Sequence, residues 1–335
     1  MNEERRVTLA HGNGGRRMRE LIEELFARHL RNPQLDTHAD AVTLRWPDAE
    51  LVFTTDGFTV QPLEFPGGDI GSLAVHGTVN DLAVSGAEPV YLALDFFLEE
   101  GFEMDRLERI LASLAGAARR CGVRVVAGDT KVVPRGQGGG LYLATTGVGR
   151  RAGAARIALD RVVAHDCILV SGPVGDHGIA VLLAREEFGL AGELRSDAAS
   201  VLPLTEALLP LPGLRFMRDP TRGGLATVAH DIAHARALEV RLHEPSIPVR
   251  AAVRAACEML GYDSLYLACE GRVVAVVAPQ DAAAALAAWR ALPAGRDAAI
   301  IGRVLAGRPR VVLETELGGE RLLDELEDDP LPRIC

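Results

Sequence analysis

The sequence ends in a cysteine, Cys335, which follows an acidic stretch containing Pro330 and Pro332. The two prolines favour an extended conformation of the last residues. If residues 319–335 were fully extended they would reach about 55 Å, enough to cross a domain. A thiol on such a tail could enter a pocket elsewhere in the molecule and carry a small group. On composition alone, a cysteine that falls by chance on a mobile end is the simpler explanation.

Several acidic residues have positions that suit a hard cation such as Mg²⁺, which prefers oxygen ligands. Asp81 follows Asn80 within a predicted helix of small residues, where a carboxylate is costly unless it is paired or bound to a cation. Asp219 begins the charged turn 218–225, where an N-cap is the alternative role. Asp56 follows the predicted strand 51–55 beside Gly57, a frequent position for a metal or ligand contact and also for a turn.

Lys131 is the only lysine among 36 basic residues. It follows the predicted strand 123–127 and stands close to Asp129 and Thr130. A lysine ammonium is a compact point charge of the kind found at phosphate-binding sites, although drift in composition also explains a single lysine. Residues 11–15 are glycine-rich and precede a predicted helix, so their N–H groups could face phosphate, and a plain turn is the alternative.

The elements that must position these residues alternate between helices and strands, which predicts an α/β (α+β) chain of two domains. We place the domains at 1–155 and 156–317, followed by a flexible tail at 318–335. Residues 264–268 and 272–278 are predicted to pair as a hairpin, with Cys269-Glu270-Gly271 as its turn. The other predicted helices are 68–87, 103–121, 197–209, 225–237 and 282–291, and the main predicted strands are 51–55, 89–98, 141–149 and 167–171.

Composition excludes several classes of protein. A net charge of −10 argues against a nucleic-acid-binding surface. We expect no signal peptide and no membrane span, because no apolar run is long enough. The five cysteines form no CxxC pair, which fits a reducing cytoplasm and offers no structural zinc site.

Taken together, these segments resemble the HypE family of hydrogenase maturation factors, within the superfamily that includes AIR synthetase and selenophosphate synthetase. The resemblance covers essentially the whole chain. It rests on seven segments in a fixed order: His11–Gly15, Asp56-Gly57, His76–Ala87, Gly128–Val133, Asp219–Leu225, Cys269-Glu270-Gly271 and the terminal Pro332-Arg333-Ile334-Cys335.

The resemblance implies a two-domain AIR synthetase-like fold. The N-terminal domain would form a barrel with its copy across a homodimer, and helices would cover the C-terminal sheet. ATP would bind between the domains. The residues implied for nucleotide binding are Gly12, Asn13, Gly14, Thr78, Asn80, Asp129, Thr130 and Lys131. The residues implied as Mg²⁺ ligands are Asp40, Asp56, Asp81 and Asp219.

The resemblance also implies an activity. The carbamoyltransferase HypF would load Cys335 with a carbamoyl group, and this chain would use Mg²⁺ and ATP to dehydrate the S-carboxamide to a thiocyanate. Cyanide would then pass to iron held by the HypC–HypD complex. Activation of the amide oxygen needs phosphoryl transfer, and loss of the remaining N–H needs a base, for which Glu270 is the first candidate and Asp129 the second.

Two other classes fit parts of the sequence. One is another ATP-using member of the superfamily that acts on a small molecule. The other is a carrier without activity that only presents Cys335 to partners. Nucleotide turnover separates them, since a pure carrier has none and a small-molecule enzyme does not need residue 335.

Overall fold

The structure is a computed structural model that describes residues 15–21, 23, 38, 42–46, 49–151, 157–185, 194–327 and 334–335. The predicted ligands Gly12, Asn13, Gly14 and Asp40 lie outside these residues. Thr130 is described by its backbone alone.

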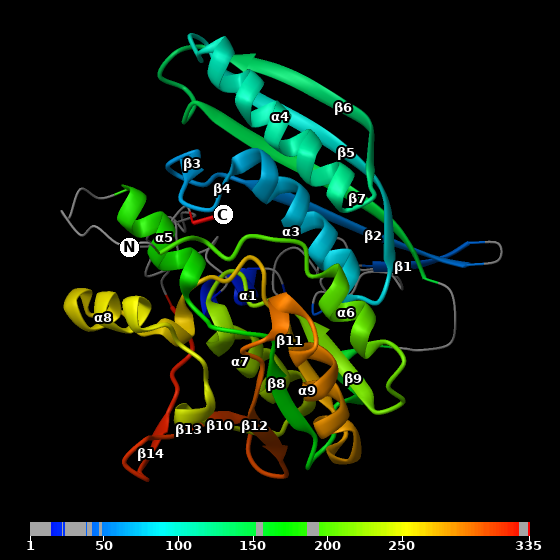
Figure 1. Cartoon of the computed structure of the whole chain (residues 1–335), viewed down its shortest axis with the longest axis vertical. Helices are drawn as coiled ribbons and strands as arrows, with labels where there is room; N and C mark the ends of the chain where they lie inside the picture. Colours follow the sequence, from blue (N-terminus) through cyan, green and yellow to red (C-terminus); the bar gives the residue numbers. More distant parts are fainter. Residues whose placement is uncertain are drawn as a thin grey trace, which may run out of the picture.

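The first half of the chain forms a five-stranded sheet in the order β1-β2-β7-β5-β6 (Figure 1). All neighbouring strands are antiparallel except β5 and β6, which are parallel. Its elements are α1 (Arg16–Leu21), β1 (Val42–Trp46), β2 (Ala49–Phe58), the small hairpin β3 (Glu64–Phe65) and β4 (Gly68–Asp69), α3 (Ile70–Val84), β5 (Glu88–Glu99), α4 (Met104–Arg120), β6 (Arg124–Val133) and β7 (Leu141–Arg151).

Helix α3 lies between the sheet and the second half of the chain, and nearly all of its residues are buried. Asp69 starts the helix with a capping box, in which its carboxylate accepts from the N–H groups of Gly71 and Ser72. The small residues of the helix allow close packing: a Cβ on Gly77 would lie 2.9 Å from the ring of Phe58 in β2. The helix thereby places Asn80 and Asp81 beside the sheet and the other domain.

The second half forms a seven-stranded sheet in the order β14-β13-β10-β12-β8-β11-β9. Helix α7 packs against one face, and α6 and α9 pack against the other, as two separate apolar clusters. Its elements are β8 (Cys167–Val170), α5 (Asp176–Arg185), α6 (Leu202–Leu208), β9 (Leu214–Arg218), α7 (Gly224–Arg236), β10 (Glu239–His243), α8 (Ala251–Leu260), β11 (Val274–Val277), α9 (Ala282–Arg290), β12 (Ala299–Leu305), β13 (Arg310–Glu314), β14 (Glu320–Leu322) and five short 3-10 helices at Leu159–Arg161, Glu244–Ser246, Ser264–Tyr266, Pro279–Asp281 and Pro293–Gly295.

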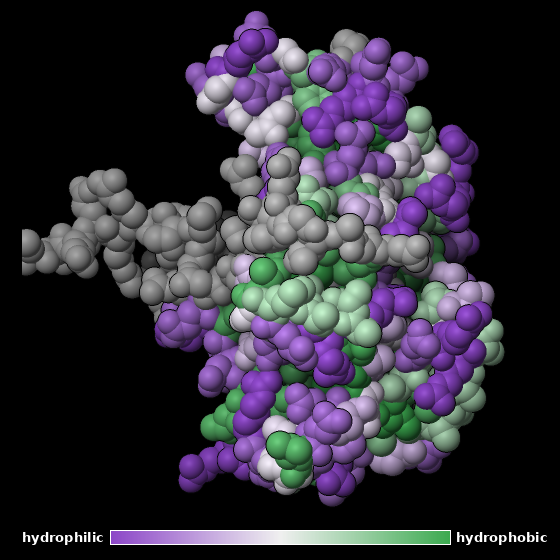
Figure 2. Space-filling model, turned by 60° about the vertical axis from the view of Figure 1, so that its left-hand side comes forward, coloured by the Kyte–Doolittle hydropathy of each residue, from purple (hydrophilic) through white to green (hydrophobic). Residues whose placement is uncertain are grey.

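The two halves share one apolar cluster. Ile179 and Leu182 of α5 and Val253 of α8 pack with Phe58 and Leu73 of the first half. On the face shown in Figure 2, hydrophilic side chains dominate the upper part, where the first half lies. The two-domain α/β architecture with a helix-covered C-terminal sheet is therefore confirmed. No helix in the described part of the chain is long and apolar enough to cross a membrane.

The predicted hairpin of residues 264–278 is wrong. Residues Ser264–Tyr266 form a 3-10 helix, capped by the Asp263 carboxylate, which accepts from the N–H of Leu265. Strand β11 instead pairs with β8 and β9. The run Ser264–Leu267 alternates as a strand would, but the side-chain cap from Asp263 stabilises a 3-10 turn there instead.

The end of strand β6 and the start of helix α6 also differ from the prediction. Lys131 lies within strand β6 rather than beyond its end, because β6 continues in register with β5 as far as Val133. The predicted helix 197–209 begins only at Leu202, where Pro203 occupies the first turn.

The start of the predicted flexible tail is part of the sheet. Strand β14 pairs with β13, and Leu323 directly after it is 2% exposed. The hydroxyl of Tyr266 donates to the carbonyl of Asp324 at 2.7 Å. The chain is therefore in contact with the second domain up to at least residue 324.

Candidate active site

The last two residues of the chain lie between the two domains. The carbonyl oxygen of Cys335 accepts from the backbone N–H of Thr59 at 3.0 Å and from its hydroxyl at 3.1 Å. Ile334 is 4% exposed and belongs to the apolar cluster shared by the two halves. Cys335 is partly buried against the same cluster. The terminal thiol is thus held within the molecule, as a tail-borne carrier requires.

His177, at the start of α5, fixes the position of Ile334. Its Nε2 lies 2.7 Å from the Ile334 carbonyl, and its Nδ1 lies 2.8 Å from the hydroxyl of Ser196. A carbonyl can only accept, so Nε2 carries the proton and Nδ1 accepts from Ser196. Complete burial lowers the pKa of His177, which keeps the ring neutral in this role.

Arg222 is a cation whose pKa responds to several predicted site residues. The negative charge of Cys335 is the largest influence on it and raises its pKa, and Asp56, Glu270 and Asp81 act in the same direction. These groups come from β2, α3, the turn before α7 and two further loops. The fold therefore brings together predicted residues from distant parts of the sequence.

Glu270 is 2% exposed, and burial raises the pKa of its carboxyl well above the usual range. The neighbouring carboxylates of Asp219, Asp197 and Asp56 raise this pKa further, and Arg222 opposes them. Among the described residues, none forms a hydrogen bond with Oε1 of Glu270. Glu270 is therefore buried among carboxylates, with Arg222 acting against their effect.

The backbone around Glu270 is fixed by Asp197. The carboxylate of Asp197 accepts from the N–H groups of Glu270 at 3.1 Å and Gly271 at 3.3 Å. A Cβ on Gly271 would lie 1.9 Å from the Asp197 carbonyl, so only glycine fits there. The N–H of Cys269 also donates to Pro220 at 2.9 Å, which joins this loop to the turn of Asp219 and Arg222.

Asp81 and Asp56 lie at the edge of the same region. Asp81 is partly exposed on α3, and its Oδ2 accepts from the hydroxyl of Thr54 at 2.8 Å. Asp56 lies within β2, and its Oδ1 accepts from the N–H of Gly57 at 2.9 Å. Asp219 is 5% exposed. The predicted metal ligands Asp56, Asp81 and Asp219 thus share one charged environment with Glu270.

Lys131 and Asp129 lie elsewhere, on the face of the first sheet that α3 and α4 leave uncovered. Their side chains form an ion pair at 2.6 Å, and both are about three-fifths exposed. The pair and nearby Asp95 raise the pKa of Lys131. No described contact joins Lys131 to Cys335 or Glu270, so its phosphate-binding role remains a prediction.

Thr78 and Asn80 are completely buried, and both have structural partners. The hydroxyl of Thr78 donates to the Ala74 carbonyl at 3.1 Å and contacts the hydroxyl of Thr145. Asn80 forms three hydrogen bonds to the second domain. Their predicted nucleotide-binding roles are untested, and these contacts give each a role in packing.

Sequence reasoning did not single out three residues of this site: Arg222, His177 and Asp197. Arg222 lies in a glycine-containing turn before α7, and His177 follows such a turn at the start of α5, which is a usable signal. Asp197 lies in an irregular segment before α6, and no sequence pattern there indicates a functional role.

The predicted Mg²⁺ ligands lie near an unsatisfied carboxyl oxygen. Oε1 of buried Glu270 makes no hydrogen bond in the described structure, and nearby carboxylates add to the effect of burial in raising the pKa of this group. Asp56, Asp81 and Asp219 supply the oxygen ligands that Mg²⁺ prefers. These residues fit a divalent cation.

Comparisons with known proteins place the chain in a family. The model of the AIR synthase related protein N-terminal domain matches residues 38–151, and that of the C-terminal domain matches residues 163–314. The carbamoyl dehydratase HypE of Azotobacter vinelandii is 49% identical over 331 residues, which cover 98% of this chain and 97% of the relative.

Two solved structures are similar over nearly the full length. A HypE–HypF complex matches with a TM-score of 0.87 and 41% identity, covering 91% of this chain and 99% of the other. A HypE in complex with ATP matches with a TM-score of 0.82 and 46% identity, covering 98% and 100%. The chain therefore belongs to the HypE family of carbamoyl dehydratases.

Proposed function

We propose that this chain is an ATP-dependent carbamoyl dehydratase of [NiFe]-hydrogenase maturation, which converts an S-carboxamide on Cys335 to a thiocyanate. The observation that carries the proposal is the position of Cys335, held by Thr59 beside Arg222 and a cluster of carboxylates. A small-molecule enzyme of the same fold has no need for its own terminus in this position.

The reaction has two steps. The carboxamide oxygen attacks the γ-phosphorus of ATP, ADP leaves, and one amide proton is lost. The C–O bond then breaks to release phosphate, the second N–H proton is lost, and the S–C≡N group remains. ATP is required because an amide oxygen is a poor leaving group and phosphate is a good one.

The residues of the site have separate roles in this scheme. Arg222 attracts the negative charge that develops as the oxygen is phosphorylated. Glu270 takes a proton from nitrogen, and its position is fixed by Asp197 through two backbone N–H groups. His177 holds the Ile334 carbonyl and orients the last residue.

We assign Asp56, Asp81 and Asp219 to Mg²⁺. Bound there, the cation would neutralise phosphate oxygens and favour the ionised form of Glu270. Lys131 is assigned to the ATP phosphates. Asp129, Thr130, Gly12, Asn13, Gly14, Thr78 and Asn80 are assigned to nucleotide binding, and Asp40 is assigned as a further metal ligand.

The proposed partners follow from relatives and from one exposed surface. The solved HypE–HypF complex supports HypF as the carbamoyl donor of this chain. We propose the HypC–HypD complex as the acceptor that carries the iron, and the cytoplasm as the compartment in which the reaction takes place. On the uncovered face of the first sheet Phe53, Tyr91 and Phe97 are 36%, 38% and 41% exposed. Such an apolar face supports a homodimer in which two sheets enclose a barrel and Lys131 lies near the interface.

Intact-mass analysis of the C-terminal peptide tests the function. After incubation with HypF, carbamoyl phosphate and Mg-ATP, Cys335 should gain the mass of a carbamoyl group and then lose one water. Cys335→Ala should abolish both changes, and Cys167→Ala, at another partly exposed cysteine, should leave them intact. Modification at Cys167, or loss of water without ATP, would exclude the proposed reaction.

A further inference from the structure

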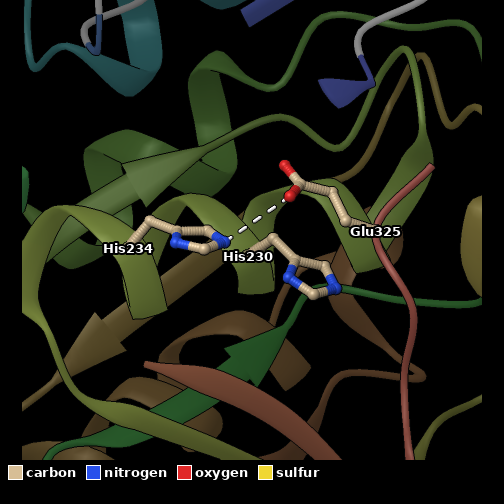
Figure 3. A group of neighbouring side chains, drawn as sticks. All are labelled: His230, His234 and Glu325. Atoms are coloured by element: carbon tan, nitrogen blue, oxygen red, sulfur yellow. Dashed lines mark ion pairs between the residues drawn. The ribbon is translucent and has the colours of Figure 1, made fainter. Parts of the chain in front are cut away.

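Outside the active site, one group of side chains has the composition of a transition-metal site. His230 and His234 lie one turn apart on α7, and Glu325 lies on the segment that follows β14 (Figure 3). One ligand atom from each residue lies within 4.8 Å of the others. Histidines spaced by four on a helix present both rings to the same side.

The buried histidine of the group has a free lone pair. His230 is 6% exposed, and its Nε2 donates to the Leu323 carbonyl at 3.0 Å, which places the proton on Nε2. Within the described structure Nδ1 has no hydrogen-bond partner. Burial, followed by the charge of His234, lowers the pKa of His230 to about 4, so this lone pair is available at neutral pH. A histidine whose other nitrogen donates to a carbonyl is the usual form of a metal ligand.

His234 and Glu325 complete the donor set. Nε2 of His234 lies 3.5 Å from Oε2 of Glu325, and the two imidazole rings stack with centroids 5.9 Å apart. An ion pair would require a protonated His234, but burial and Arg19 lower its pKa. Two neutral imidazoles and one carboxylate are the ligands of many zinc sites that keep a fourth position open for water.

Arg19 of α1 is the protein cation that now neutralises the carboxylate. Its guanidinium donates to Oε2 of Glu325 at 2.8 Å. Asp231 and Glu23 also face His234 and favour its protonated form. The guanidinium of Arg19 also contacts Oε1 of Glu325, so a metal ion must displace Arg19 from one of the two oxygens, and the two positive charges repel. Arg19 therefore weakens metal binding.

We propose that His230, His234 and Glu325 bind one divalent transition-metal ion of the zinc class. Imidazole ligands favour zinc, cobalt or copper over Mg²⁺. The site contains no cysteine, which is why cysteine spacing does not reveal it. The ion would link α7, which follows the turn of Asp219 and Arg222, to the segment that precedes the Cys335 tail. This proposal does not depend on the proposed function.

Co²⁺ titration of the metal-free full-length protein tests the site, with visible absorption as the readout. We expect one Co²⁺ per chain with the spectrum of nitrogen and oxygen ligands, and displacement by Zn²⁺. His234→Ala and Glu325→Gln should each weaken binding by more than about tenfold. These exposed or partly exposed positions are used because replacement of buried His230 would also affect folding.

Two control variants identify the site. His243→Ala removes an exposed histidine whose Nδ1 lies 2.7 Å from Ser246, and Cys335→Ala removes the terminal thiol. Both should bind Co²⁺ like the unmodified protein. Absence of binding at micromolar Co²⁺, binding that His234→Ala and Glu325→Gln leave unchanged, or a thiolate charge-transfer band lost in Cys335→Ala would overturn the proposal.

Arg19→Gln distinguishes a metal site from a purely structural cluster. If the group binds a metal, removing the competing cation should tighten Co²⁺ binding several-fold. Unchanged or weaker Co²⁺ binding in a folded Arg19→Gln protein would contradict the proposed competition.

Discussion

The side chain of Asn80, on the helix of the first domain, donates to the backbone carbonyl of Glu270 in the second domain at 3.2 Å. The same amide donates to the Ala199 carbonyl at 3.0 Å, and its oxygen accepts from the N–H of Val201 at 2.9 Å. One side chain therefore fixes the distance between the helix that carries Asp81 and the loop that carries the proposed base.

Asn80→Ala should destabilise the protein by about 3 kcal/mol, because it removes three interdomain hydrogen bonds and takes the side-chain acceptor from the buried N–H of Val201. Chemical denaturation measures this change. Glu88→Ala, which removes an exposed ion pair with Arg150, should change stability by less than about 1 kcal/mol. If Asn80→Ala kept its stability and lost only ATP affinity, Asn80 would be a nucleotide ligand and not an interdomain contact.

Asp81→Asn should reduce Mg²⁺-dependent ATP cleavage at least about 100-fold, because an amide cannot replace the charge of a metal ligand. The oxygen that accepts from Thr54 is retained, so the unfolding temperature should change little. Asp105→Asn, at an exposed position in the first turn of α4, is the matched control and should retain activity. Normal turnover of Asp81→Asn at saturating Mg-ATP would show that Asp81 is not a Mg²⁺ ligand.

Glu270→Gln should bind ATP and accept the carbamoyl group but accumulate carboxamide or its phosphorylated form on Cys335. Loss of a general base slows proton removal by about 10²–10⁴-fold. The fold should persist, since the amide of Gln has nearly the shape and volume of the buried carboxyl that it replaces. Quenched-flow mass spectrometry of the tail measures the step. If thiocyanate forms at the normal rate, Asp129 becomes the next candidate base.

Lys131→Arg should slow phosphoryl transfer although it keeps the charge, because a planar guanidinium cannot occupy the position of a compact ammonium. Arg124→Lys, an exchange on the same exposed strand, should have no effect on ATP cleavage. Single-turnover rates with saturating ATP compare the two variants. Equal rates for Lys131→Arg and the unmodified protein would contradict the phosphate-binding role of Lys131 and leave only its surface ion pair with Asp129.

His76 should make the folded state sensitive to mild acid. It is 7% exposed on α3, and burial, followed by the charge of Arg120, lowers its pKa to about 4. Between this value and the unfolded pKa of about 6.5, the unfolded chain binds more protons, so stability falls as pH falls through this window. The loss should approach roughly 3 kcal/mol below pH 4. Denaturation of His76→Leu from pH 8 to 4 should show a shallower decline; an identical slope would contradict this account.

The sequence predicts the parts of this molecule that depend on local pattern. The buried helix that carries Asn80 and Asp81, the strand before Asp56 and the helix after Gly223 are all confirmed, because their periodicity and glycines act locally. The closeness of Asp56, Asp81 and Asp219 to Glu270 followed from family resemblance and not from spacing.

Contacts between distant segments account for what the sequence did not reveal. The largest charge acting on Arg222 is that of Cys335, more than a hundred positions away in the sequence. His177 likewise forms its hydrogen bond with the carbonyl of Ile334, far along the chain. The strand pairing of Val274–Val277 was missed because its partners lie in β8 and β9 and not next to it in sequence. His230 and Glu325 come together only when β14 joins the sheet.

The pairing of β14 with β13 also limits the length of chain that connects the thiol of Cys335 to the second domain. Glu327 still forms an ion pair with Arg16, and from that point residues 328–335 span at most about 26 Å even when fully extended. A connecting segment this short keeps the effective concentration of the thiol at the active site of the same chain in roughly the millimolar range. The donor and acceptor proteins must therefore bind against this enzyme's surface, because the modified cysteine cannot travel far to meet them.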